Sequence, residues 1–108
     1  HLPILVTENG IGAPDILEAD GKIHDAYRIQ FIREHLQQMR LAITDGVQIL
    51  GYCPWAAIDV VSTHQGYRKR YGFIYVDREE FDLKELKRFR KDSFYWYANV
   101  ILENGQNL

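Results

Sequence analysis

Glu8 is the side chain in this sequence whose position most directly suggests chemistry. It follows the strand-like apolar run Ile4–Thr7 and directly precedes Asn9-Gly10, a dipeptide typical of turns. Enzymes built on α/β barrels carry catalytic residues at the carboxyl ends of their strands. Many strands end beside a solvated glutamate, so the pattern alone permits both a catalytic and an ordinary surface role.

A second group of candidate residues follows the next apolar run, within residues 47–77. The group consists of Trp55, Ser62, Lys69 and Tyr71. Taken alone, a tryptophan at a strand end is most simply a core aromatic, and the other three are most simply members of a solvated loop. The repeated layout of a strand followed by a polar loop strengthens the case for Glu8, because neighbouring parallel strands end at the same edge of a sheet.

Two strands and two helices would position these side chains. Five apolar residues recur at spacings of three and four and predict an amphipathic helix that begins after an Asp25 cap and ends near Asp45, with Gly46 as the stop. These five are Ile29, Ile32, Leu36, Met39 and Ile43. Residues 47–55 are apolar on both faces over most of their length, which is typical of a parallel strand covered by helices.

The remaining segments are expected to be loops, one extended piece and a last helix. Residues 10–23 and 59–70 are rich in polar or turn-forming side chains, and residues 73–76 form a short apolar run. The charged segment 77–91 is expected to be solvated. We expect Asp92 or Ser93 to cap a last helix that ends before Gly105.

Strands and helices that alternate in this way predict an α/β fold with a parallel sheet. Two strands alone cannot form a stable sheet, so the apolar faces need further strands and helices. The sequence also begins at His1, within its first apolar run. We therefore expect residues 1–108 to be a piece of a longer domain.

Composition argues against several classes of function. The net charge of −2 gives no field that would attract nucleic acid or a membrane surface, and no apolar run is long enough to span a bilayer. The single cysteine, Cys53, cannot form an internal disulfide, which weakly favours a reducing compartment. The four histidines lack metal-ligand spacing, so we expect no metal site.

Several motifs together resemble glycoside hydrolase family 1 across essentially the whole chain. Residues 4–10, Ile-Leu-Val-Thr-Glu-Asn-Gly, are similar to the nucleophile motif of that family. The other motifs follow in the family's order and spacing: Asp25-x-x-Arg28, Asp45-Gly46-Val47, Gly51-Tyr52, Trp55-x-x-x-Asp59, Gly66-Tyr67, Arg70-Tyr71-Gly72 and Lys91-x-Ser93. The resemblance implies the last two β–α units, or C-terminal quarter, of a (β/α)8 TIM barrel.

The resemblance also implies roles for the candidate residues. Glu8 would be the nucleophile of a retaining glycosidase, which needs a second carboxyl group as acid/base roughly 5–5.5 Å away. The family's acid/base lies in an Asn-Glu-Pro motif, which these 108 residues do not contain. We therefore expect the chain alone to be inactive. Trp55 would form a platform under the sugar, and the family often has a cis peptide bond after this tryptophan.

One departure from the family's common pattern indicates the class of substrate. Where β-glucosidases of the family usually carry Glu-Trp, this sequence has Ser62-Thr63. Ser62, Lys69 and Tyr71 match the residues with which the phospho-glycosidase branch holds a sugar 6-phosphate. A glutamate would repel that dianion, whereas a hydroxyl and an ammonium group can donate hydrogen bonds to it.

The small residue Thr63 favours a 6-phospho-β-glucoside over the corresponding galactoside, because phospho-galactosidases of the family resemble one another in keeping a tryptophan there. A 6-phospho-β-galactosidase and a non-catalytic relic or binding fragment are the alternatives. Substrates would be phosphorylated cellobiose or aryl glucosides, no cofactor is implied, and the substrate class favours a cytoplasmic location. The remainder of the barrel, or self-association, would cover the apolar faces.

Overall fold

The computed structural model describes residues 1–108 and contains four strands and two helices. The elements are, in chain order, β1 (Ile4–Asn9), α1 (Ala26–Thr44), β2 (Ile49–Pro54), β3 (Ile74–Val76), β4 (Arg88–Arg90) and α2 (Asp92–Leu102). Strands β1 and β2 form a parallel pair, and β3 and β4 form an antiparallel pair. The predicted order of strand, helix, strand, long loop and helix is confirmed.

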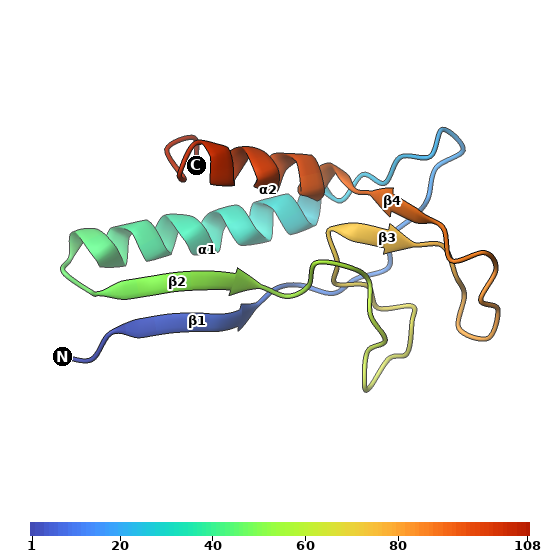
Figure 1. The fold of residues 1–108 in the computed structure, drawn as a ribbon, viewed down its shortest axis with the longest axis horizontal. Helices are drawn as coiled ribbons and strands as arrows, with labels where there is room; N and C mark the ends of the chain where they lie inside the picture. Colours follow the sequence, from blue (N-terminus) through green and yellow to red (C-terminus); the bar gives the residue numbers. More distant parts are fainter.

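Both helices lie on the same side of the β1–β2 pair, with α1 between the strands and α2 (Figure 1). The predicted apolar stripe explains this arrangement, because Ile32 and Leu36 of α1 are buried against Phe73 and against Val100 of α2. The β3–β4 hairpin lies beyond the carboxyl ends of β1 and β2 (Figure 1). The apolar core therefore lies between the two helices and Phe73, and it reaches the parallel strands through Tyr52 of β2.

The structure corrects the prediction that residues 77–91 are solvated throughout. Residues 88–90 pair with β3, and Lys91 is fully buried. The local sequence could not show this, because the residues that neighbour Lys91 in the chain are charged whether its side chain is buried or exposed. The two carboxylates that pair with the Lys91 ammonium are 76 and 32 residues away in the chain.

Both predicted helix caps are right in approximate position and wrong in role. Asp25 is the N-cap residue of α1, but its carboxylate makes no capping hydrogen bond and accepts from the Ser93 hydroxyl and the Arg28 guanidinium instead. The N-cap residue of α2 is Lys91, which comes before both predicted caps. The carboxylate and hydroxyl therefore join the two helix starts to each other rather than ending either helix.

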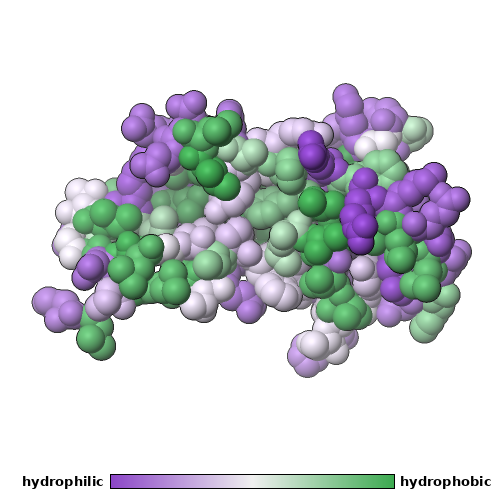
Figure 2. All heavy atoms as spheres, viewed as in Figure 1, coloured by the Kyte–Doolittle hydropathy of each residue, from purple (hydrophilic) through white to green (hydrophobic).

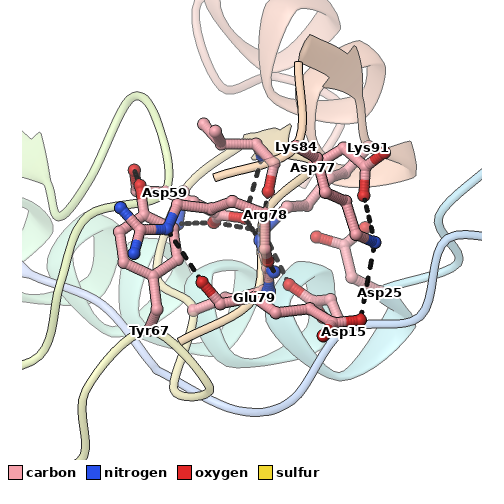
Figure 3. Close-up of polar contacts among 12 residues, drawn as sticks. Asp15, Asp25, Asp59, Tyr67, Asp77, Arg78, Glu79, Lys84 and Lys91 are labelled. Atoms are coloured by element: carbon pink, nitrogen blue, oxygen red, sulfur yellow. Dashed lines mark hydrogen bonds and ion pairs between the residues drawn. The ribbon is translucent and has the colours of Figure 1, made fainter. Parts of the chain in front are cut away.

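A buried ionic network joins the loops beyond the strand ends to the starts of both helices (Figure 3). The Lys91 ammonium donates to Asp15 at 2.6 Å and to Asp59 at 2.7 Å. The guanidinium of Arg28 lies 3.1 Å from the Asp15 carboxylate. The network is electrically balanced, with three carboxylates (Asp15, Asp25, Asp59) and three cations (Arg28, Arg70, Lys91).

Much apolar surface is left uncovered. Only 16 of the 108 residues are buried, and the large exposed apolar side chains include Leu2, Leu5 and Leu50 on or beside the parallel strands. Figure 2, drawn in the same view as Figure 1, shows apolar surface at the end of the molecule where the chain begins. Neither helix has the length and apolar character needed to cross a membrane.

We predict that Lys91→Met lowers the free energy of unfolding by about 3–5 kcal/mol, because it leaves two buried carboxylates without their shared cation. Lys87→Met is the matched control, since the Lys87–Glu85 pair is exposed and 2.8 Å long. Its removal should cost less than about 1 kcal/mol. Denaturant unfolding measures both values, and equal losses would contradict the structural role of Lys91.

Candidate functional site

Glu8 and Trp55 lie at the same edge of the parallel sheet. Glu8 is the fifth residue of β1, and Trp55 immediately follows β2. The Trp55 amide donates to the Asn9 carbonyl at 2.8 Å, which extends the pairing of the two strands beyond β2. Trp55 is 43% exposed, and Glu8 is exposed with a carboxylate that forms no hydrogen bond within the chain. Both are thus available to a ligand.

The backbones at this edge approach very closely. A Cβ atom on Gly10 would lie 1.9 Å from the Trp55 carbonyl oxygen, so only glycine fits. The Trp55–Ala56 peptide bond is cis, as the family resemblance implies. The hydroxyl of Tyr52 donates to the side-chain oxygen of Asn9 at 2.6 Å, and burial raises the pKa of Tyr52 to about 12, with a further contribution from Tyr97. Tyr52 therefore remains a hydrogen-bond donor at neutral pH and holds the residue next to Glu8.

Lys69 and Tyr71 form a second part of the candidate site. The Lys69 ammonium lies 5.4 Å from the centre of the Tyr71 ring. Both side chains lie against Gly12, where a Cβ atom would be 2.6 Å from a carbon of the Tyr71 ring and 2.9 Å from Cε of Lys69. Lys69 and Tyr71 thus pack against the backbone of the loop that follows Glu8.

Backbone hydrogen bonds fix the register of that contact. Ala13 and Arg70 exchange two backbone hydrogen bonds, each 3.0 Å long. Beside this pairing is a pocket whose lining includes the two cationic residues Arg68 and Lys69. A pocket with two cations and few apolar groups suits an anion better than an apolar ligand.

Ser62 and Thr63 precede Lys69 and Tyr71 in the loop that follows β2. Ser62 is 9% exposed, and its Oγ accepts weak hydrogen bonds from the amides of His64 and Gln65, at 3.4 Å and 3.3 Å. Its hydroxyl hydrogen has no acceptor within the chain. Thr63 is exposed. The structure thus brings Lys69 and Tyr71 together, whereas no hydrogen bond joins Ser62 to either of them.

Arg70, which the sequence identifies only as part of the motif Arg70-Tyr71-Gly72, is a buried structural residue. Its guanidinium donates to the Asp59 carboxylate at 2.9 Å and to the carbonyl of Val76 at 2.7 Å. Asp59 also accepts from the Gly72 amide at 3.0 Å. The charge of Arg70 is therefore neutralised in the interior, while Lys69 and Tyr71 on either side of it contact Gly12.

Sequence reasoning recognised Asp25, Arg28, Asp59 and Lys91 as motif residues, but it assigned only a helix-cap role to Asp25 and no contacts to the others. It missed Asp15 as a member of the network. The motif spacings contained the only available indication. Asp59 follows Trp55 by four residues, and Arg70 lies between two candidate ligand-binding residues. A charged residue so close to a site either contacts the ligand or supports the residues that do. An exposed side chain fits the first role, and a buried one fits the second.

The charges of the network favour an ionised Asp15. Burial by itself raises the pKa of this carboxyl, but the neighbouring Lys91 and Arg28 outweigh burial and hold the pKa below its ordinary value of 3.8. Burial and the charge of Arg28 lower the pKa of Lys91, against the opposing effects of Asp59 and Asp15. No group of histidine, cysteine and acidic residues in the structure has a metal-binding arrangement.

Comparison with known proteins places the chain in a family. The model of Glycosyl hydrolase family 1 matches residues 1–106. Aryl-phospho-beta-D-glucosidase BglC of Bacillus subtilis is 52% identical over all of this chain and 22% of its own length. A phospho-cellobiase of Klebsiella oxytoca is 51% identical over 98% of this chain and 23% of its own length.

Solved structures agree with this result. A family 1 β-glucosidase from Thermotoga maritima superposes with a TM-score of 0.86 at 40% identity, over 95% of this chain and 22% of that protein. The chain belongs to glycosyl hydrolase family 1. The predicted fold class is confirmed, since these β–α units form part of a (β/α)8 barrel and span less than a quarter of the relatives named above.

We predict that stability falls as pH drops below about 4, because a carboxyl whose pKa is lower in the folded state stabilises the fold only while it is ionised. The contribution of Asp15 is complete above its unfolded pKa and is lost as pH falls through the folded pKa. Thermal unfolding from pH 7 to pH 2.5 measures this effect. Asp15→Asn should lower the midpoint at pH 7 and flatten the acid limb, and an unchanged acid limb would exclude Asp15 as its source.

Proposed function

We propose that the chain supplies the nucleophile and the phosphate-binding part of a retaining glycosidase that hydrolyses 6-phospho-β-D-glucosides. The observation that carries this proposal is the Lys69–Tyr71 pair, held on Gly12 in the loop that follows Glu8. Support also comes from relatives near 50% identity that are named aryl-phospho-β-D-glucosidase and phospho-cellobiase. Those names describe the relatives, and we extend the substrate class to this chain as a proposal.

In the proposed mechanism Glu8 attacks the anomeric carbon of the sugar. The C–O bond to the leaving group breaks as a carboxylate ester forms, and water later hydrolyses that ester. An acid/base carboxyl outside these 108 residues would protonate the leaving group and then activate the water. Trp55 would lie under the sugar ring, since its exposed side chain is at the strand end next to that of Glu8.

Recognition of the 6-phosphate would fall to Lys69, Tyr71 and Ser62. The Lys69 ammonium supplies a full positive charge, and the two hydroxyls supply further donors. The hydroxyl of Ser62 is available to donate because it acts only as an acceptor within the chain. Thr63 is small and exposed, which we propose leaves room for an equatorial O4, as in glucose.

The substrate class suggests a setting for this activity. Glycosides phosphorylated during uptake are present inside the cell, so we propose a cytoplasmic location. The exposed apolar side chains along β1 and β2 would be covered by the other β–α units of the barrel. No cofactor enters the proposed reaction, since two carboxyl groups and a water molecule suffice.

Glu8→Gln tests the nucleophile. The variant is made in a complete barrel, in which these 108 residues replace the matching segment of the Bacillus subtilis relative. We expect hydrolysis of nitrophenyl 6-phospho-β-glucoside to fall by about 10⁴-fold or more, because the amide cannot form the ester. Glu103→Gln, on the exposed end after α2, is the control.

The isolated 108-residue chain should give no turnover with the same substrate. Activity of the isolated chain that disappears on Glu8→Gln would contradict the proposed need for a second carboxyl group outside it.

Lys69→Ala tests the phosphate assignment in the same complete barrel. We expect KM for the phosphorylated glucoside to rise by about 10- to 100-fold, as for the loss of a charge-assisted hydrogen bond. KM for the unphosphorylated glucoside should change little. Lys22→Ala, in an exposed part of the β1–α1 loop, is the matched control. Equal effects of Lys69→Ala on both substrates would refute the phosphate assignment.

A further inference from the structure

The loop formed by residues 59–71, called here the phosphate loop, is held from outside by the segment between β3 and β4. The backbone amide of Tyr67 donates to the Glu80 carboxylate at 2.6 Å. The same carboxylate occupies the space beside Gly66, where a Cβ atom would lie 2.3 Å from one of its oxygens. Gly66 also has a φ of +61°, a conformation that glycine adopts without strain.

Tyr67 connects this contact to the base of the phosphate loop. Its hydroxyl donates to the Asp59 carbonyl at 3.1 Å. The guanidinium of Arg78 lies 4.1 Å from the centre of the Tyr67 ring and donates to the Glu80 carbonyl at 2.9 Å. Figure 3 shows Tyr67 beside Arg78, near the Asp59 end of the ionic network. Glu80 and Arg78 thus hold Tyr67 from one segment.

The position of Tyr67 bears on both proposed phosphate ligands. Ser62 and Gly66 exchange two backbone hydrogen bonds, 2.9 Å and 3.1 Å long. A displacement of Gly66 therefore moves Ser62 directly. Lys69 follows Tyr67 by two residues, before the loop is fixed again where Arg70 pairs with Ala13. The Glu80 contact is thus the external anchor of the stretch between the two ligands.

We propose that Glu80 is a positioning residue for recognition of the 6-phosphate. It touches no substrate atom and acts by accepting the Tyr67 amide hydrogen, which holds Ser62 and Lys69 in one arrangement. This inference rests on the proposed function. The direction of the change in affinity distinguishes a positioning role of Glu80 from a simple effect of its charge. Removal of a negative charge near a phosphate would strengthen substrate binding, whereas loss of the contact with Tyr67 weakens it.

Three variants in the complete barrel separate these effects. Glu80→Ala removes both the charge and the acceptor, and Glu80→Gln removes the charge but keeps an acceptor oxygen. Glu79→Ala is the matched control, since Glu79 is the exposed neighbour and its carboxylate contacts Lys84 at 3.6 Å instead of the phosphate loop. KM and kcat are measured for the phosphorylated and the unphosphorylated glucoside.

We expect Glu80→Ala to raise KM for the phosphorylated substrate by about 5- to 20-fold, with kcat and both constants for the plain glucoside unchanged. Glu79→Ala should behave as the parent, and Glu80→Gln should not raise KM for the phosphorylated substrate, because it keeps the acceptor and loses only the charge. Hydrogen exchange across residues 62–71 should quicken in Glu80→Ala and not in Glu80→Gln. An unchanged or lowered KM in Glu80→Ala, an equal rise for both substrates, or a Gln variant that behaves as the Ala variant would each overturn the inference.

Lys69→Ala, measured in parallel, identifies which proposal fails. If Lys69→Ala weakens binding of the phosphorylated substrate selectively and Glu80→Ala does not, the role of Glu80 alone is wrong. If Lys69→Ala affects both substrates equally, the phosphate assignment is wrong and the role of Glu80 in phosphate recognition is overturned with it.

Discussion

The pairing of the buried Lys91 ammonium with the carboxylates of Asp15 and Asp59 is the interaction on which the rest of the structure depends. Each carboxylate belongs to the loop that follows one of the two parallel strands, and Lys91 immediately precedes α2. One cation therefore fixes two loops and the start of a helix relative to one another. A buried charge that loses its partner costs several kcal/mol, so these segments cannot separate independently.

Different interactions stabilise the two ends of the molecule. Apolar packing of Ile32, Leu36, Phe73 and Val100 joins the helices to the body of the fold. Beyond the strand ends the buried ionic network holds the loops together, because these loops contain carbonyl groups that apolar side chains cannot hydrogen-bond. Arg70 alone donates to the carbonyls of Val76 and Arg78, both at 2.7 Å. The polar end is also where both candidate groups of site residues lie, so rigidity and chemistry share one region.

The sequence predicted what depends on periodicity and failed where a charge is buried. The stripe through Ile32 and Leu36 predicted α1, and the pattern of parallel strands predicted that Glu8 and Trp55 lie at the same edge of the sheet. Lys91 was wrongly assigned to solvent, because its partners lie 76 and 32 residues away and no local pattern marks them. Arg70 was recognised only as a motif residue, and its burial shows a structural role that no local pattern indicates.

The alternation of side chains across residues 69–71 explains how exposed functional groups remain well placed in a loop. Arg70 forms an isolated antiparallel bridge with Ala13, and neighbouring side chains at such a pairing tend to point to opposite sides. Arg70 faces Asp59 in the interior, and Lys69 and Tyr71 contact Gly12. A shift of one residue would put a lysine or a tyrosine in place of the guanidinium, whose planar fork reaches the Asp59 carboxylate and two carbonyls at once. The buried arginine therefore fixes the register of the ligand-binding residues on either side of it, and the loop needs no regular secondary structure to be rigid.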